Sequence, residues 1–544
     1  MEIAPLQTSL GKYADNVRDA LDGLAQSDVV GRIWRKDYTV WSPQAEQITD
    51  RLGWLNVFDC MYEQLGVMQS FARQVKQAGF RHVVLLGVGG SSLGAEVIRQ
   101  TFGGKSGYPE LIVLDSTEPE TIKTVTEKID PVKSLFLVSS KSGTTSEPLL
   151  LFRYFWEIVE NLVPKDEAGR NFVAITDAGT YLARVAEEKQ FRHIFANPAD
   201  VGGRYSVLTY FGLVPGILTG FDPGRLLERA ESMKKRCLPD VVPADNDGAW
   251  LGACVAALAL RGRDKLTFVI SNSARGFGLW VEQLIAESTG KSGKGIIPVS
   301  GEPPVGPEFY GQDRLFVYLR LRTDNNLSTD NAVKALQTSG QPVVVLEMAD
   351  EYDLGAEFFR WEFATAVAGA ILNIHPFNQP NVQQAKDATE RLLKDFSSLA
   401  AHLPSLEGTG LLRDLLTRSG PGKYVAIMAY LPQTPAVDAA LTELRQKLLQ
   451  RYCVATTLGY GPRFLHSTGQ IHKGGPNTGL FLQLTARHIA RVPIPGLPYT
   501  FADVLDAQAL GDREALNANG RDVASVRLPA PDADSVRELI PEVC

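Results

Sequence analysis

Cysteine is scarce in this sequence: the 544 residues include five cysteines, which are scattered along the chain and form no Cys-x-x-Cys pair. An odd number of scattered cysteines argues against a disulfide framework or a zinc ribbon. The longest apolar run, residues 253–260, is far shorter than the roughly 20 residues that cross a bilayer. The first ten residues lack a basic-then-apolar signal pattern. We therefore expect a cytoplasmic protein without a membrane partner.

An excess of basic residues is also missing. Lys and Arg total 55 against 62 Asp and Glu, which gives a net charge of −7, and no long basic run occurs. This balance disfavours nucleic acid as a partner, so any anionic ligand must be held by a local cluster of donors. Apolar residues at 44% and charged residues at 22% are typical of a globular protein with a large core. The length allows roughly three or four domains.

One stretch, residues 140–148, is rich in groups that bind anions. It follows the apolar strand pattern of residues 135–138 and precedes a helical pattern, and it combines a run of hydroxyls with a glycine and Lys141. Backbone N–H groups and side-chain donors at such a helix start can converge on one phosphate. A capped helix without a ligand would explain one or two hydroxyls but not the run. Because Gly-x4-Gly-Lys-Ser/Thr is absent, a sugar or metabolite phosphate is favoured over a nucleotide.

A glycine-rich loop at residues 87–94 follows the buried strand pattern of residues 81–86. Glycines in such a loop let the backbone approach a ligand closely. A dinucleotide-binding fold is the alternative, and Asp115 at the end of the next strand pattern imitates its ribose-binding acid. However, the sixth position of Gly-x-Gly-x-x-Gly is Ser92 here, and a lone fingerprint of this kind is weak evidence. We therefore disfavour NAD.

Strand and helix patterns alternate along the chain, which predicts parallel sheets of the βαβ type. The expected strands are residues 81–86, 111–114, 135–138, 173–176 and 193–195, then 266–273, 295–299, 315–319 and 342–346. A C-terminal region is expected to have strands at 423–431 and 479–485, a helix at 436–451 and a turn-rich segment at 459–478. The predicted organisation is a helical arm (1–80), two α/β domains (81–240 and 241–404) and a small α+β domain (405–544).

Two further stretches carry candidate site residues. Gly203 and Arg204 follow a strand-like segment, where a flexible main chain and a fixed cation can reach one ligand; a surface turn is the alternative. Gln283 and Glu287 lie four residues apart, on one face of a predicted helix. The negative end of that helix would raise the pKa of Glu287, which suits a general base, although an ordinary solvated helix would show the same spacing.

The loop at residues 460–473 is dense in donors and glycine and contains His466 and His472. Two histidines six residues apart without neighbouring carboxylates or thiolates do not predict a metal site. An interface loop is an equally good interpretation of this composition.

Taken together, five motifs resemble phosphoglucose isomerases and occur in the same order. They are Gly87-Val88-Gly89-Gly90-Ser91, Ser140-Lys141-Ser142-Gly143-Thr144-Thr145, Val201-Gly202-Gly203-Arg204-Tyr205-Ser206, Gln283-x3-Glu287-Ser288-x-Gly290-Lys291 and Gln379-x6-Lys386. They cover residues 40–395, and the whole chain is most similar to the isomerase half of bacterial transaldolase and phosphoglucose isomerase fusions, without the transaldolase barrel. The resemblance implies an α/β fold with two SIS-type (sugar isomerase) parallel-sheet α-β-α domains, each with five strands, plus the small C-terminal α+β domain. It also implies a homodimer whose active sites draw on both subunits.

The resemblance further implies what the matched residues do. Substrate contacts are expected from Gly90, Ser91, Ser140, Lys141 (chiefly by its backbone), Ser142, Thr145, Gly203, Gln283 and Gln379. Glu287 would be the base, Arg204 would face the reacting carbons and Lys386 would assist ring opening. The implied reaction interconverts glucose 6-phosphate and fructose 6-phosphate through a cis-enediol, in glycolysis and gluconeogenesis, with no cofactor and no metal.

One position departs from the family pattern. The family has a histidine in a Gly-Gln-His segment, donated by the neighbouring subunit for ring opening, where this sequence reads Gly311-Gln312-Asp313. Asp313, His375 and His466 are the candidates for the missing acid. We favour His466 because it lies in the additional C-terminal region.

Two other functions fit part of the sequence. A non-catalytic sugar-phosphate sensor would use the same sheet and phosphate loop but has no need of a helix-end base beside a cation. The isomerase portion of glucosamine-6-phosphate synthase would require a glutaminase with an N-terminal cysteine nucleophile, whereas the first cysteine here is Cys60.

Overall fold

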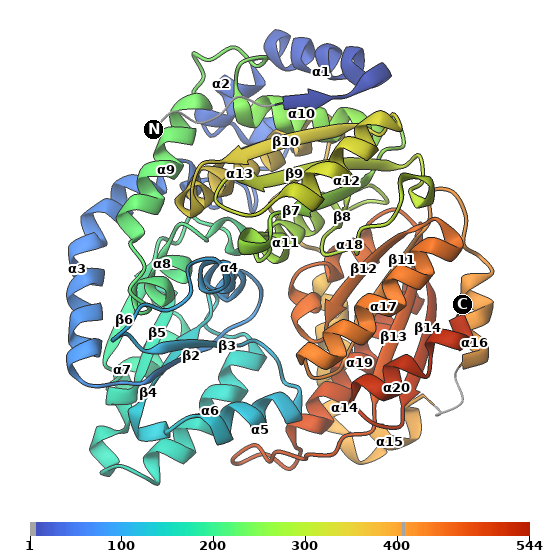
Figure 1. Ribbon diagram of the computed structural model, residues 1–544. Coiled ribbons are helices and arrows are strands. Elements are labelled where there is room, and N and C mark those ends of the chain that lie inside the picture. Colours follow the sequence, from blue (N-terminus) through green and yellow to red (C-terminus); the bar gives the residue numbers. More distant parts are fainter. Residues whose placement is uncertain (1–6, 405–408, 544) are drawn as a thin grey trace.

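The computed structural model describes residues 7–404 and 409–543, and it has three sheets arranged around a central region (Figure 1). The first sheet has five parallel strands in the spatial order β3 (Glu110–Leu114), β2 (His82–Leu86), β4 (Ser134–Ser139), β5 (Phe172–Asp177) and β6 (His193–Asn197). The helices around it are α3 (Val57–Gln77), α4 (Leu93–Phe102), α5 (Pro119–Lys128), α6 (Ser146–Glu160), α7 (Tyr181–Glu188) and α8 (Tyr210–Ile217).

Helices cover both faces of the first sheet. Along β2, Val83 and Leu85 pack into the core that contains residues of α3, α4 and α8, whereas Val84 and Leu86 pack against α5, α6 and α7. Both faces are therefore apolar, which is why the strands appear in the sequence as continuous hydrophobic runs. This confirms the first predicted parallel sheet.

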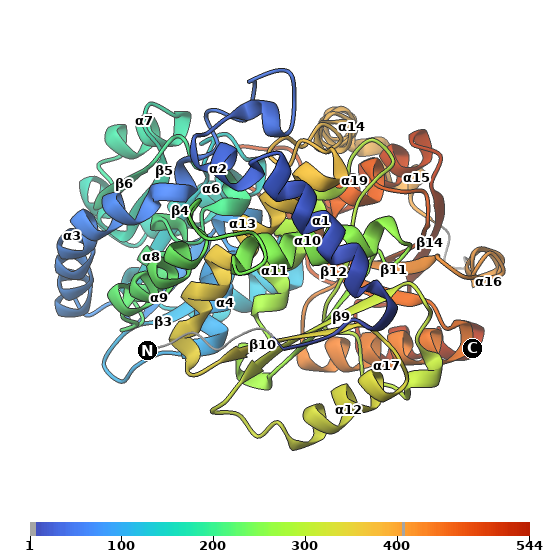
Figure 2. The ribbon, with the colours of Figure 1, turned by 90° about the horizontal axis from the view of Figure 1, so that it is seen from above.

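The second sheet has the spatial order β1 (Gln7–Ser9), β10 (Val343–Met348), β9 (Arg314–Leu321), β7 (Lys265–Ile270) and β8 (Ile297–Val299). Its helices are α9 (Pro223–Arg236), α10 (Asp247–Leu260), α11 (Phe277–Thr289), α12 (Leu327–Thr338) and α13 (Leu354–Leu372). The implied sheet of five parallel strands is wrong in one strand, because β1 is antiparallel to β10 and comes from the N-terminal arm. The arm's helices are α1 (Ala14–Gln26) and α2 (Val29–Trp34), and α1 lies along α10 (Figure 2).

The third sheet has the spatial order β12 (Ala455–Tyr460), β11 (Tyr424–Ala429), β13 (Gly479–Ala486) and β14 (Asp522–Leu528). Its longer helices are α14 (Val382–Lys394), α17 (Pro435–Tyr452) and α19 (Phe501–Ala518); its short ones are α15 (Leu399–His402), α16 (Thr409–Leu416), α18 (Gly469–Gly474), α20 (Ala533–Arg537) and α21 (Ile540–Val543). All four strands are parallel, so this region is α/β and the predicted α+β class is wrong. The prediction missed β14 and also β12, most of which lies between the predicted helix and the segment expected to form turns.

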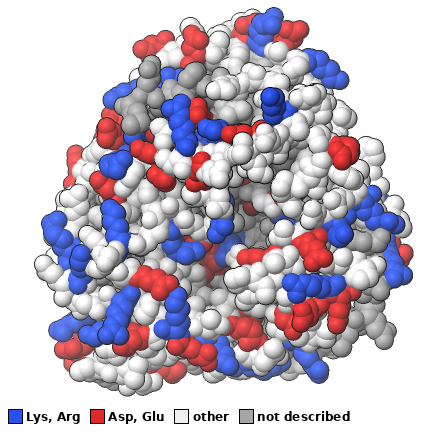
Figure 3. Space-filling view, viewed as in Figure 1, with Lys and Arg blue, Asp and Glu red and all other residues white. Residues whose placement is uncertain are grey.

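The two faces of the third sheet pack into two different hydrophobic cores. One face, with Val425 and Ile427, packs against α17, whereas the other, with Ala426 and Met428, shares a core with α19 and with Ala286 of α11. The loop after β12 is thereby held against the helix that carries Gln283 and Glu287. The face shown in Figure 3 is hollowed near its centre, with charged side chains around the hollow. Within the described residues, no helix has the length and hydropathy needed to cross a membrane.

Candidate active site

A cavity of about 310 Å³ lies where the three sheets meet. It is lined by every predicted site residue except Ser140, namely Gly90, Ser91, Lys141, Ser142, Thr145, Gly203, Arg204, Gln283, Glu287, Gln379, Lys386 and His466. Residues that the sequence placed up to several hundred positions apart are therefore neighbours. The lining also includes residues that the sequence analysis did not select, among them Gln47 and Arg51 of the N-terminal arm and the aromatic residues Tyr205 and Phe377.

The hydroxyl-rich loop connects β4 to α6, and its hydroxyls hold one another in place. Ser140, which is buried, donates from Oγ to Thr145 Oγ1 over 3.0 Å. Ser142 Oγ accepts from the backbone N–H of Thr144 over 3.3 Å. Ser140 thus shapes the loop from behind instead of facing the cavity. The Lys141 ammonium pairs with Asp177. A chiefly backbone contribution of Lys141 to the substrate stays a prediction.

Two glycine loops meet beside the hydroxyl-rich loop. A Cβ on Gly90 would lie 2.1 Å from the carbonyl oxygen of Gly203, closer than two such atoms can approach. Ser206 Oγ donates to that same carbonyl oxygen over 2.6 Å. The glycine at position 90 is therefore required by the close approach of the two backbones, which brings the Arg204 loop to the cavity.

The floor of the cavity holds a buried ion pair. Arg204 Nε lies 3.1 Å from Glu287 Oε2, and both side chains are 5% exposed. The Arg204 guanidinium also donates to Gln379 Oε1 over 2.8 Å and to the carbonyl oxygen of Pro376 over 3.2 Å. Gln283 Nε2 lies 3.4 Å from Glu287 Oε2. A permanent cation therefore lies beside the carboxylate and fixes the segment that carries Gln379.

Burial raises the pKa of the Glu287 carboxyl, and the nearby Arg204 cation and His466 reduce this shift without cancelling it. The direction is the one expected from the sequence. The main physical cause is desolvation of the charged form, however, and not the helix dipole that the sequence position suggested.

His466 reaches the cavity from the loop after β12. Its backbone carbonyl accepts from Gln283 Nε2 over 2.8 Å, and its ring Nε2 lies 2.8 Å from Glu147 Oε1. Burial opposes ionisation of Glu147, but the charge and hydrogen bond of His466 prevail and lower its pKa to about 2. Glu147 was not among the residues predicted from the sequence, although its position in the first turn of α6, directly after the hydroxyl-rich loop, was a usable signal. Lys386 is exposed on α14 and faces the same cavity.

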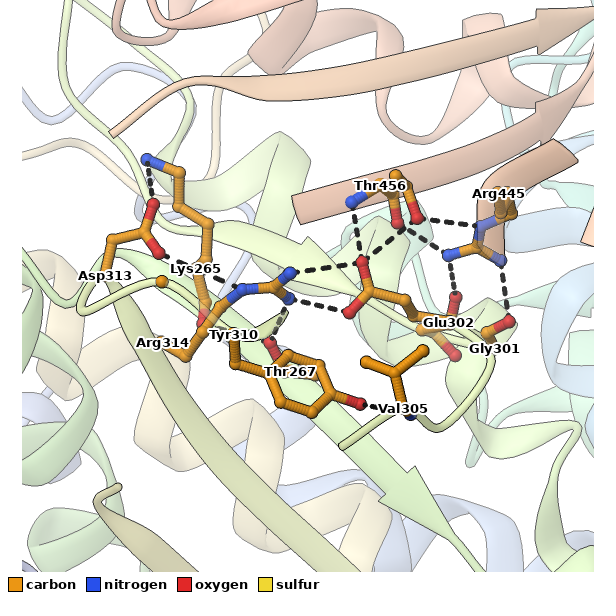
Figure 4. A network of polar contacts seen from close by, with 12 residues as sticks. Lys265, Thr267, Gly301, Glu302, Val305, Tyr310, Asp313, Arg314, Arg445 and Thr456 are labelled. Carbon is orange, nitrogen blue, oxygen red and sulfur yellow. Dashed lines mark hydrogen bonds and ion pairs between the residues drawn. The ribbon is translucent and has the colours of Figure 1, made fainter. Parts of the chain in front are cut away.

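The other two candidates for the ring-opening acid lie elsewhere. Asp313 directly precedes β9, at the amino end of the second sheet, where its Oδ2 is 3.7 Å from Lys265 Nζ (Figure 4). His375 is held by backbone groups: Nε2 lies 3.2 Å from the carbonyl oxygen of Glu46, and Nδ1 accepts from the N–H of Phe377 over 3.1 Å. Neither residue lines the cavity. Asp313 therefore does not face the cavity of its own chain, and its substitution for the family's histidine, which comes from the neighbouring subunit, stays a prediction.

The network in Figure 4 instead joins the second and third sheets. Arg314, whose side chain is fully buried, pairs with Glu302 over 2.9 Å, and Glu302 Oε1 accepts from the backbone N–H of Thr456 over 2.7 Å. Arg445 donates to the carbonyl oxygens of Ser300 and Gly301 over 3.0 and 2.7 Å. These charge-assisted bonds fix the C-terminal region, and with it His466, relative to α11.

Solved structures with the same arrangement show the fold. A protein of Thermus thermophilus has a TM-score of 0.60 and 23% identity, covering 72% of this chain and 100% of that one. A glucose-6-phosphate isomerase from Chlamydia trachomatis has a TM-score of 0.54 and 17% identity, covering 71% and 85%. The chain therefore has the α/β class of fold that these two structures share.

Sequence comparison identifies relatives of this chain. The family model for phosphoglucose isomerase matches residues 58–295. Relatives named glucose-6-phosphate isomerase include those of Staphylococcus saprophyticus (28% identical over 388 residues, 63% of this chain and 87% of the relative) and Streptococcus pyogenes (29% over 406 residues, 65% and 90%). These matches make the chain similar to phosphoglucose isomerases along more than half of its length. Its similarity to the isomerase half of transaldolase fusions stays a prediction.

Proposed function

We propose that this chain interconverts glucose 6-phosphate and fructose 6-phosphate. The observation that carries the proposal is the buried pair of Glu287 and Arg204 at the floor of a cavity whose rim is the hydroxyl-rich loop. The names of its relatives support this activity. A non-catalytic sensor has no use for a buried carboxylate with a raised pKa, and a glutaminase-dependent synthase is not favoured by the family match.

In the proposed mechanism, Ser91, Ser142 and Thr145 bind the phosphate of the open-chain sugar, with backbone N–H groups at the start of α6. Anchoring the phosphate holds the flexible chain with C1 and C2 against the base, which lowers the entropic part of the barrier. Glu287 removes the proton from C1 of fructose 6-phosphate, and a proton moves between the two oxygens. Glu287 then returns its proton to C2.

Negative charge develops on the enediolate oxygen during this transfer. Arg204 is fixed by four different acceptors and is 6% exposed, so its charge needs no reorganisation and is weakly screened by water. Gln283 and Gln379, which flank this pair, would bind the sugar hydroxyls. We propose that His466, with Lys386, opens the sugar ring. In this proposal the base and the ring-opening group come from one chain. We also propose that the chain forms a homodimer in the cytoplasm.

The direct test is to mix the purified chain with fructose 6-phosphate in D2O, without added metal, and to follow the reaction by proton NMR. We expect glucose 6-phosphate with deuterium at C2, because a carboxylic acid exchanges its proton with solvent between abstraction and return. Binding of fructose 6-phosphate without any product would support the sensor instead. Light scattering of the same sample would test the homodimer.

The raised pKa of Glu287 predicts the acidic side of the pH profile. Catalysis requires the carboxylate, and burial raises its pKa above the usual 4.5, so kcat should fall as the pH drops through a value above 4.5. Bound substrate excludes more water and preserves this shift. The measurement is kcat at saturating fructose 6-phosphate across the acidic range. If kcat instead fell only at or below pH 4.5, the Arg204 cation would affect the pKa of Glu287 more strongly than burial does.

A further inference from the structure

A buried glutamine contacts the carboxylate behind His466. Gln508 lies on α19, is 4% exposed, and donates from Nε2 to Glu147 Oε1 over 2.8 Å. His466 Nε2 lies at the same distance, 2.8 Å, from that same oxygen. One carboxylate oxygen is thus shared by an imidazole from the loop after β12 and an amide from α19.

Thr117 fixes the orientation of the Gln508 amide. Its Oγ1 donates to Gln508 Oε1 over 2.7 Å, and Thr117 is fully buried in the segment between β3 and α5. Because an ionised carboxylate only accepts hydrogen bonds, the amide nitrogen must face Glu147 and the amide oxygen must face the hydroxyl. The three side chains come from three separate segments and form one continuous chain of hydrogen bonds that ends at His466.

This arrangement decides which ring nitrogen is free. Glu147 is held as an acceptor by Gln508, by His466 and, on Oε2, by Ser146 Oγ at 3.0 Å, so His466 must carry its proton on Nε2 toward Glu147. No hydrogen bond joins Nδ1 of His466 to another residue in the described part of the chain. Nδ1 is then the nitrogen that can take the proton of the anomeric hydroxyl and pass it on to the sugar ring oxygen, which leaves the imidazole neutral at the end of ring opening.

We propose that Gln508 is a positioning residue for ring opening: by fixing Glu147 from behind, it sets the tautomer and orientation of His466. This inference rests on the proposed isomerase function and adds a second contribution of the C-terminal region to the site. It assigns Gln508 no contact with the substrate.

The test compares Gln508→Leu with a matched control that also holds α19. Gln483 is likewise a buried glutamine, since its Nε2 donates to the carbonyl oxygen of Ala509 over 2.8 Å and its Oε1 accepts from Ser525 Oγ over 2.9 Å. Gln483→Leu therefore removes an equivalent pair of bonds without touching Glu147. Two substrates are used: fructose 6-phosphate, and an analogue without the C5 hydroxyl that cannot close a ring.

With Gln508→Leu we expect kcat on fructose 6-phosphate to fall about tenfold, because one hydrogen bond to a charged group is lost. KM should stay unchanged, as should turnover of the acyclic analogue. The control should leave the ratio of the two rates at its original value. Thr117→Val, which preserves the shape of the side chain, should give a smaller loss of kcat, again on fructose 6-phosphate and not on the acyclic analogue. This variant replaces Gln508→Leu in the test if Gln508→Leu does not fold.

Equal losses on both substrates, or no loss on fructose 6-phosphate in either variant, would overturn the proposal. If the unmodified chain turns over neither substrate, the isomerase function itself is refuted, and the role of Gln508 with it. If the unmodified chain does turn over the analogue, the isomerase function holds, and a negative result with Gln508→Leu refutes only the role of Gln508.

Discussion

Glu287→Gln is expected to bind fructose 6-phosphate and to lose about 10³-fold in kcat. The amide keeps the size of the side chain and leaves the hydroxyl-rich loop intact, but it cannot accept the proton from carbon. NMR of product formation gives kcat, and calorimetric titration gives binding.

Glu282→Gln is the matched control for this variant. Glu282 lies on the same helix, and burial raises its pKa to about 8 despite the nearby Arg445. At neutral pH it is therefore mostly uncharged, and an amide changes little. Its Oε1 accepts from the backbone N–H of Ser300 over 3.3 Å, outside the cavity lining. Turnover by Glu287→Gln close to that of Glu282→Gln would exclude Glu287 as the base.

His466→Ala is expected to lower kcat on ring-closed fructose 6-phosphate about 100-fold, while the acyclic analogue is turned over at nearly the original rate. The reason is that the substitution removes the proton donor for the ring oxygen, whereas Glu287 and Arg204 remain paired. Steady-state kinetics with the two substrates measure the difference.

His488→Ala serves as the control, because the structure repeats the same pairing away from the cavity. His488 Nε2 lies 2.9 Å from Oδ1 of Asp506, which is on α19, and the side chain of His488 is 6% exposed. Because this pair of histidine and carboxylate lies away from the cavity, its loss should not change the ratio of the rates on fructose 6-phosphate and on the acyclic analogue. If His466→Ala slowed both substrates equally, ring opening would have to be assigned to another group, with Lys386 first.

Local patterns in the sequence predicted most of the elements that carry the site. The hydrophobic runs of β2 and β4 and the polar loops after them were identified because a strand covered on both faces is continuously apolar and its end is not. The acidic residue Glu147 was missed because an acid in the first turn of a helix usually has no role beyond the helix dipole. Its contacts with His466 and Gln508, 319 and 361 positions away, distinguish it.

The sequence by itself determined the α/β class and the hydroxyl-rich loop, since each depends on neighbours within one or two turns of chain. Its resemblance to phosphoglucose isomerases supplied Glu287 and Arg204 as the proposed catalytic pair. Tertiary structure alone decided that Asp313 lies at the amino end of the second sheet, outside the lining of this cavity, and that His466 lies beside Gln283. It also decided that the third sheet is parallel, because the two strands missed there are identified by their partners more than by their own residues. The physical reason is common to these cases: register, burial and the docking of one sheet against another depend on contacts between distant segments, which no local pattern contains.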